Sequence, residues 1–140
     1  MNNLIESKII KCLQDKAIKV INDKNIKCLN INYDPPVDKK WWEVVYIPNN
    51  IENEFWADTA KTYRGIFRLI LHWPQKSQGI YKPLEEAERV ANGFQKNTEL
   101  FSSDGTVKVI ITDTPNITTI IEDRPQLMIG LTIKYSCFNM

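Results

Sequence analysis

Hydrophobic residues near the start of the chain recur at helical spacing. Ile5, Ile9, Leu13, Ala17 and Ile21 follow one another every four residues, which places their side chains on one face of an α-helix. The polar positions between them carry Lys8, Lys11, Asp15, Lys16 and Lys19. The pattern predicts an amphipathic helix over residues 3–22 with a solvated basic face.

A second helical stripe occurs after the middle of the chain and predicts a helix over residues 83–95. Its apolar positions are Leu84, Ala87, Val90, Ala91 and Phe94. Pro83 suits the first turn, because a proline there removes no intrahelical hydrogen bond. Glu85, Glu86 and Glu88 follow it, and we expect them to be solvated near the positive end of the helix dipole.

Runs of β-branched and aromatic residues predict five strands, at residues 26–31, 41–47, 62–73, 107–112 and 127–135. Pro48 and Pro74 close the second and third, because proline cannot donate to a strand ladder. The element order αβββαββ is not a series of βαβ units. It predicts an α+β fold, a mainly antiparallel or mixed five-stranded sheet with two helices packed on it.

The composition excludes some classes of protein but does not identify the function. The 140 residues fit one domain, over residues 1–140, and 18 basic against 17 acidic side chains give a net charge of +1. This balance argues against a strongly basic nucleic-acid binder, and we expect no sequence-specific nucleic acid as a partner. No segment reaches the ~20 apolar residues of a membrane helix. Three cysteines without a CxxC motif indicate reduced, buried thiols.

Motifs for catalysis are missing from the sequence. Its five glycines lie singly, and it has no GxSxG elbow or paired metal ligands. His72, the single histidine, is interpreted as a structural or interface residue. We therefore expect no catalytic residue, no cofactor and no metal, with a small enzyme of unrecognised type as the alternative from another functional class.

Large apolar residues outside the expected core point to self-association. Phe55 and Trp56 lie in a long connection at residues 49–61, and Ile117, Ile120 and Ile121 lie in another at 113–126. Such residues either fold back over the sheet or contact another protein. The third and fifth strands are also apolar on both faces. Two helices cover only part of such a sheet, so a subunit interface is expected to cover the rest.

The stretch from Gly65 to Tyr135 resembles the tail terminator, or tail completion, family of long-tailed bacteriophages, of the lambda minor tail protein U type. The resemblance rests on Tyr63-Arg64-Gly65-Ile66-Phe67, on Trp73-Pro74, on the helix from Leu84 to Phe94, on Val107-Lys108-Val109 and on the strand from Met128 to Tyr135. The first helix and the strand that ends at Ile47-Pro48 fit the same element order. Trp41 and Trp42 depart from it and have no assigned role.

The resemblance implies a protomer that assembles into a ring, commonly a hexamer. The ring would cap the tail tube, stop its polymerisation and present a surface to the head. The implied partners are other copies of the chain, the major tail tube protein and a head-tail connector protein. The implied location is the virion tail, after assembly in the host cytoplasm. A neck or head-completion connector is the alternative within this class.

We expect six contact residues for such a ring. They are Phe55, Trp56, Arg64, Ile117, Ile120 and Ile121. The motifs of the family do not assign roles to these positions. They are chosen because a head-to-tail interface can close a ring by joining apolar loop residues of one copy to the sheet of its neighbour.

Overall fold

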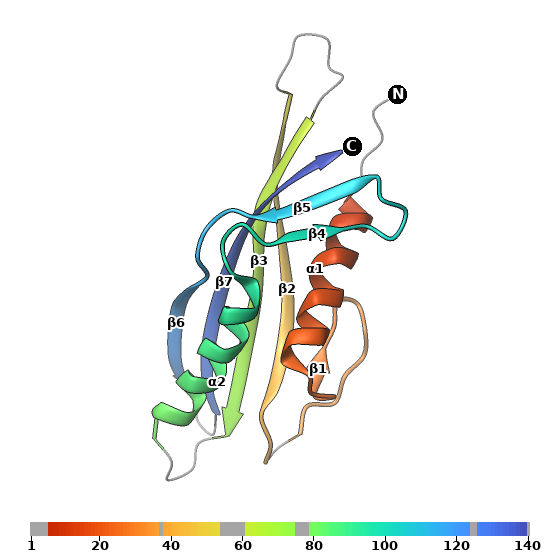
Figure 1. The fold of residues 1–140 in the computed structure, drawn as a ribbon. Coiled ribbons are helices and arrows are strands. Elements are labelled where there is room, and N and C mark those ends of the chain that lie inside the picture. The colour runs from red at the N-terminus through yellow and green to blue at the C-terminus, as the bar shows by residue number, and fades with distance from the viewer. Residues whose placement is uncertain (1–5, 37, 54–60, 75–78, 124–125, 140) are drawn as a thin grey trace.

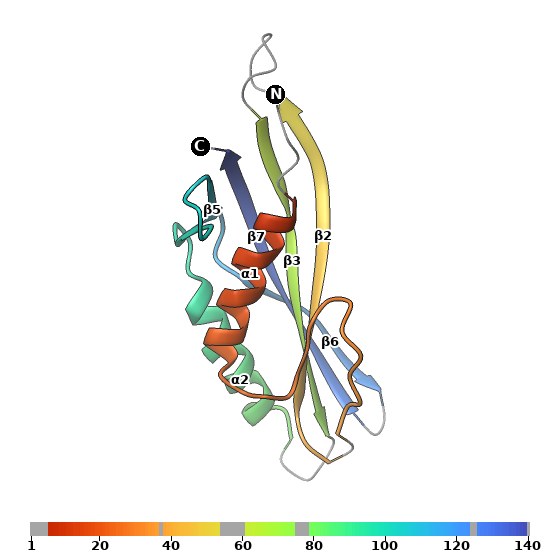
Figure 2. The ribbon, with the colours of Figure 1, turned by 90° about the vertical axis from the view of Figure 1, so that its right-hand side faces the viewer.

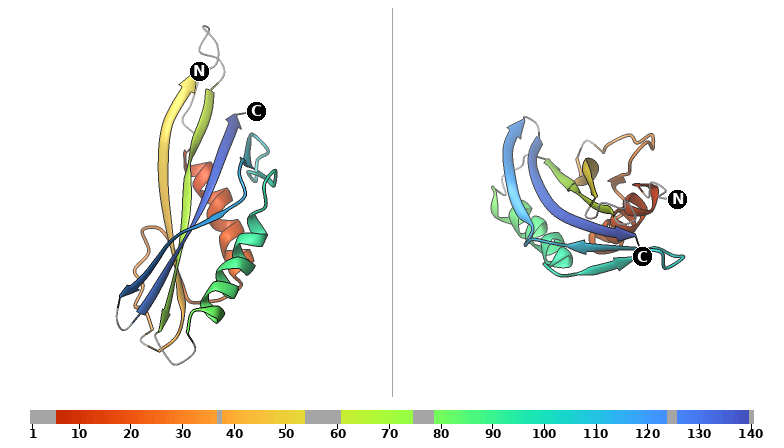
Figure 3. Two further views of the ribbon diagram at one scale, coloured as in Figure 1. Left: turned by 90° about the vertical axis from the view of Figure 1, so that its left-hand side faces the viewer. Right: turned by 90° about the horizontal axis from the view of Figure 1, so that it is seen from above.

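The computed structural model describes residues 6–36, 38–53, 61–74, 79–123 and 126–139. Two helices lie side by side on one face of a curled sheet, with both helices on the same side of the strands (Figures 1 and 3). The described strands form one seven-stranded sheet, in which β1–β2 is parallel and the other pairs are antiparallel. The expected α+β class with a mixed sheet is confirmed.

Helix α1, Glu6–Ile21, buries the predicted apolar stripe. Ile9, Leu13, Ala17 and Ile21 are at most 1% exposed. The helix ends where Asn22 adopts a positive φ of 52°, a left-handed conformation that asparagine tolerates better than most residues. The helix predicted over residues 3–22 is therefore present over its described part.

The sheet is built around two long strands, β3 (Lys61–Pro74) and β7 (Gln126–Asn139). They pair antiparallel without interruption from Thr62 opposite Phe138 to Pro74 opposite Gln126. β2 (Trp41–Asn53) and the short β1 (Ile26–Lys27) continue the sheet beyond β3. On the other edge of β7, β6 (Asn116–Asp123) pairs with its first half, and β5 (Val107–Ile111) pairs with its second half. β4 (Glu99–Phe101) is added to β5.

The core lies between the helices and one face of this sheet. Because side chains alternate along a strand, residues paired across strands share a face. Trp42 is opposite Leu71, which is opposite Ile129 on β7, and all three are 0% exposed. Trp41 has the opposite orientation. The two neighbouring tryptophans thus belong to different faces, and Trp42 is a core residue.

Helix α2, Tyr81–Ala91, continues into a 3-10 helix, Asn92–Phe94, that ends the second helical segment. A Cβ atom on Gly93 would lie 2.4 Å from Cγ1 of Val20, so the absence of a side chain lets this segment approach α1 closely. Because α2 begins at Tyr81, its first turn carries no acidic residue. The expectation that Glu85, Glu86 and Glu88 lie near the positive, N-terminal end of the helix dipole is wrong.

Glu86 instead points into the junction between the two helices and β2. Its side chain is 10% exposed and lies 2.9 Å from both Nε and Nη2 of Arg89. It accepts a hydrogen bond from Nε1 of Trp42 and lies 3.3 Å from Nζ of Lys40. Burial opposes ionisation of this carboxyl, but its bonds with Arg89 and the charge of Lys40 outweigh that effect and lower its pKa.

Arg89 also joins α2 to the end of α1. Its Nη1 and Nη2 atoms donate to the carbonyl oxygens of Val20 and Ile21, each at 2.9 Å. These carbonyls belong to the last turn of α1, which lacks intrahelical donors. Arg89 therefore caps one helix from another, and we refer to Glu86 and Arg89 together as the helix clamp.

The sheet has more strands than the five predicted, since β4 and β6 were not expected. β6 occupies the connection that we predicted at residues 113–126, and it forms a hairpin with β7. β2 does not end at Pro48 but continues to Asn53, with an irregularity in its register between Pro48 and Ile51. The first predicted strand, 26–31, is reduced to two residues. That residues 1–140 form one domain stays a prediction.

Candidate interaction surfaces

The first surface is the outer strand β6. Ile117, Ile120 and Ile121 are 37%, 50% and 47% exposed. Within the described chain β6 has one hydrogen-bonded neighbour, β7, so its other edge is unpaired. An unpaired edge presents backbone donors and acceptors to which another strand can add. The structure thus brings three predicted contact residues together on one exposed edge.

The second surface is the sheet face opposite the helices. Trp41 and His72 are cross-strand partners there, and their rings stack 3.8 Å apart with an interplanar angle of 4°. Nε2 of His72 lies 3.0 Å from Oε1 of Glu43. Tyr33 lies in the connection between β1 and β2 and not in the sheet, and its ring packs against the ring of Trp41. This packing gives His72 a structural role and also places Trp41.

Several buried polar atoms on this face lack a partner. Among the described residues, Nε1 of Trp41, Nε of Arg68, Nδ1 of His72 and the hydroxyl of Tyr33 are buried without a hydrogen bond. Trp41, Arg68 and His72 share the face by register, and Tyr33 packs against it. A buried polar group left unpaired costs about 1–3 kcal/mol. These atoms are already covered within the subunit, so this cost belongs to the packing of the face itself.

Arg64 lies apart from the β6 isoleucines. It is exposed on β3 opposite Ser136, whereas Ile121 is opposite Met128 of the same strand β7. Eight residues of strand correspond to about 26 Å. Arg64 lines a shallow cavity of about 460 Å³ with Thr112 and Lys134. Phe55 and Trp56, the other two predicted contact residues, lie outside the described residues.

The hydroxyl groups of Tyr135 and Tyr46 form a chain of hydrogen bonds that ends at the carboxylate of Glu6. The hydroxyl of Tyr135 donates to that of Tyr46 at 2.7 Å, and Tyr46 donates to the Glu6 carboxylate. Burial raises the pKa of Tyr135 to about 12, and burial together with the bond to Glu6 raises the pKa of Tyr46. A Cβ atom on Gly65 would lie 2.5 Å from the Tyr135 hydroxyl. Gly65, within the resembling motif, is thus required by packing.

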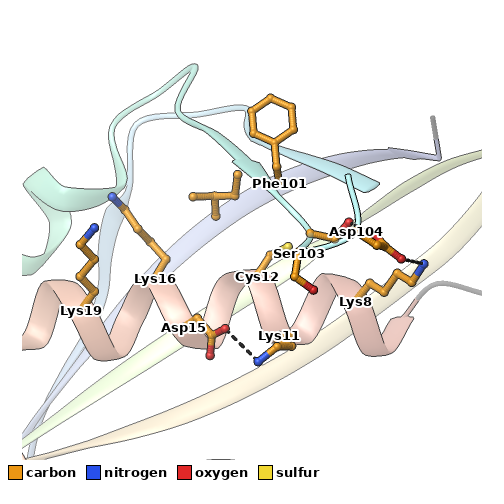
Figure 4. A pocket seen from close by; sticks show the side chains of 11 residues that line it. Lys8, Lys11, Cys12, Asp15, Lys16, Lys19, Phe101, Ser103 and Asp104 are labelled. Carbon is orange, nitrogen blue, oxygen red and sulfur yellow. Dashed lines mark hydrogen bonds and ion pairs between the residues drawn. The ribbon is translucent and has the colours of Figure 1, made fainter. Parts of the chain in front are cut away.

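The third surface is a groove between α1 and the β4–β5 hairpin, with a volume of about 330 Å³ (Figure 4). Cys12, Leu100 and Phe101 provide apolar surface, and Phe101 is 58% exposed. The polar lining comes from Lys8, Lys11, Asp15, Lys16, Lys19, Ser102, Ser103 and Asp104. We call it the lysine groove. The basic face predicted for the first helix is therefore one wall of a groove.

Ion pairs engage only part of the charge in the lysine groove. Nζ of Lys8 donates to Asp104 at 2.7 Å and to the Thr106 hydroxyl at 2.8 Å. The bond from Lys8, with those from Ser102 and Thr106, lowers the pKa of Asp104. Lys11 lies 3.2 Å from Asp15.

Two lysines of the lysine groove are available to bind a negatively charged group. Lys16 and Lys19 have no ion-pair or hydrogen-bond partner among the described residues. In Figure 4 both extend to the side of α1 that faces Phe101. The groove therefore combines two uncompensated positive charges with an apolar wall, which suits an acidic segment carrying an apolar side chain.

Within the described residues, no group of three His, Cys, Asp or Glu side chains is placed to hold a metal ion. None of the described helices has the length and apolarity to cross a membrane. The features that the described residues do offer are an unpaired apolar edge, a half-covered sheet face and a charged groove. Together they are typical of a protein that works by binding other protein subunits.

Comparisons with known proteins identify the family. The family model for the phage tail terminator protein matches residues 8–135, and the chain belongs to this family. A solved structure aligns with 97% of this chain and 93% of its own, with a TM-score of 0.66 and 17% sequence identity, a likeness that supports the fold alone. No curated protein sequence matches the chain.

Family membership identifies the chain as a structural protein of a phage tail. The absence of a catalytic activity stays a prediction. The narrower resemblance to the lambda minor tail protein U type stays a prediction.

Proposed function

We propose that copies of this chain, commonly six, close into a ring. The ring caps the tail tube, stops tube polymerisation and provides the surface to which the head joins. The family match over residues 8–135 carries this proposal. The mechanism is geometric: one ring face is complementary to the last ring of tube protein, and the other face is not. Stopping a polymer in this way requires no reaction, only a surface that the tube protein does not recognise.

Ring closure needs two different surfaces on each copy, because a head-to-tail interface joins one surface to another. The β6 edge with Ile117, Ile120 and Ile121 supports one such surface. Arg64 is about 16 Å from Ile117 and about 26 Å from Ile121 along β7, and it supports the other surface. Phe55 and Trp56 are proposed as further contacts. The proposed partners outside the ring are the major tail tube protein and a head-tail connector protein.

The self-association part is tested by light scattering and electron microscopy of the purified chain. Wild-type protein should form rings, alone or with tube ends. Ile120→Lys combined with Ile121→Lys should raise the apparent dissociation constant of the ring at least about tenfold, because two charges would be buried at the contact. Ile31→Lys is the matched control, since Ile31 is 60% exposed and lies outside β6. If the double variant and the control assemble equally well, β6 is not part of the interface.

The biological part is tested in the phage. Particles assembled without this chain should have overlong tails that lack heads, and supplying the chain in trans should restore normal tail length. Assembly takes place in the host cytoplasm, so infected-cell lysates contain the relevant particles. Tails of normal length that fail to join heads would contradict the terminator and favour the neck connector.

A further inference from the structure

The lysine groove has the charge and shape to bind a specific kind of peptide. Lys16 and Lys19 have no partner among the described residues, and Leu100 and Phe101 lie across from them on β4. A carboxylate placed near the two ammonium groups would gain charge-assisted contacts. A large apolar side chain next to that carboxylate would cover the exposed ring of Phe101. The fitting ligand is an acidic segment with an adjacent aromatic residue.

The chain itself contains such a segment. Residues 52–58 read Glu-Asn-Glu-Phe-Trp-Ala-Asp, with three carboxylates around two large aromatic side chains. Glu52 and Asn53 are the last residues of β2, and the rest of the segment belongs to the connection from β2 to β3. The described parts of these strands form a ribbon that extends past the N-terminal end of α1 (Figures 1 and 2). Asn53 pairs with Lys61, so this ribbon ends close to residues 54–60.

Geometry makes this contact intermolecular. Seven residues lie between Asn53 and Lys61, which are paired with each other. Because the connection must leave the ribbon and return to it, its farthest point is at most about 12 Å from the end of the ribbon. Lys16 and Lys19 lie about 15 Å and about 20 Å along α1 from its first residue, Glu6, and the ribbon ends beyond that end of the helix. The segment therefore cannot reach Lys16 and Lys19 of its own copy.

We propose that residues 52–58 of one copy bind in the lysine groove of a second copy. Glu52 and Glu54 pair with Lys16 and Lys19, and Phe55 or Trp56 packs against Leu100 and Phe101. This inference rests on the self-assembly proposed above and names a contact that holds neighbouring copies together. It also gives the otherwise unpaired lysines of α1 a function, and it predicts assembly that weakens as salt screens the charges.

The first test is a charge exchange, read as assembly of the full-length chain by light scattering. Lys16→Glu with Lys19→Glu should raise the apparent dissociation constant at least about tenfold, since like charges then face each other. Glu52→Lys with Glu54→Lys should do the same. The combination of all four substitutions should return assembly to within about threefold of wild type, because the charges are again complementary.

Matched controls separate this effect from a general change of charge. Lys39→Glu with Lys82→Glu alters the net charge equally, at two exposed positions outside the groove. Circular dichroism should show that every variant melts within a few degrees of wild type. Assembly of the groove variant equal to that of the control, or no recovery in the fourfold variant, would overturn the proposal while leaving the ring intact.

The second test does not depend on ring formation. A fluorescent synthetic peptide of residues 50–60 should bind the wild-type chain in an anisotropy titration, and the Lys16→Glu, Lys19→Glu variant should lose that binding. If the wild-type chain forms no ring but binds the peptide, the self-assembly proposal fails and the groove assignment stands. If rings form and the peptide does not bind, the groove assignment is wrong.

Discussion

The helix clamp allows a quantitative prediction about stability, tested by the substitution Glu86→Gln. The carboxylate accepts two bonds from Arg89 and one from Trp42, and it lies beside Lys40. A fully buried ion pair costs about 3–5 kcal/mol when broken, whereas an exposed pair contributes about 0–1 kcal/mol. The Glu86 side chain is 10% exposed, but that of Arg89 is 47% exposed and keeps its bonds to α1. We therefore expect a loss of about 1.5–2 kcal/mol.

The expected loss corresponds to a Tm about 5–8 °C lower for a domain of this size. It is measured by urea and thermal unfolding at pH 7, followed by circular dichroism. Because the folded pKa of Glu86 is lowered, its contribution is present above the unfolded pKa and is lost as pH falls through the folded pKa. The difference between wild type and variant should therefore shrink below about pH 4. Glu85→Gln, on the exposed side of α2, is the control, and equal effects of the two substitutions would refute the reasoning.

Three further substitutions test other close contacts of the core. Gly65→Ala should destabilise the fold by about 1–3 kcal/mol, because the new Cβ would overlap the Tyr135 hydroxyl; unchanged urea unfolding would show that β3 has room there. Gly93→Ala should cost a similar amount by pushing the 3-10 helix away from Val20, and the double variant Gly93→Ala, Val20→Ala should recover part of the loss. Tyr46→Phe should lower stability by about 1 kcal/mol, and it should leave one tyrosine fewer with delayed ionisation in an alkaline titration at 295 nm.

Strong periodic patterns predicted most of the fold correctly. The helices and the strands β3, β5 and β7 were found because their apolar positions alternate or recur over several turns. β6 was missed because the register irregularity between Ile117 and Thr119 disrupts that alternation. β4 has only three residues, too few to show a period. β2 passes Pro48 because a proline is tolerated where the ladder is already irregular.

The candidate surfaces were predictable only in part. Exposure of the β6 isoleucines agrees with the expectation of unburied apolar residues, but their role as contacts stays a prediction. The lysines of the first helix were visible in the sequence, yet the opposite wall of the groove comes from β4, about 80 positions later in the chain. Glu86 differs from its exposed neighbour Glu85 only by its direction on the helix. No local pattern reveals such a difference before the packing of α2 is known.

The central ladder between β3 and β7 also constrains when the protein can fold. It pairs Thr62 with Phe138 and Pro74 with Gln126, so its partners are more than fifty positions apart in the chain. At about 5–20 residues per second, synthesis needs about 3–13 s to proceed from β3 to β7. During this interval β3 has no β7 partner, and β6 has no strand on which to form. Copies therefore acquire the β6 edge only after β7 has been synthesised, which separates synthesis of the β6 strand from its use in assembly.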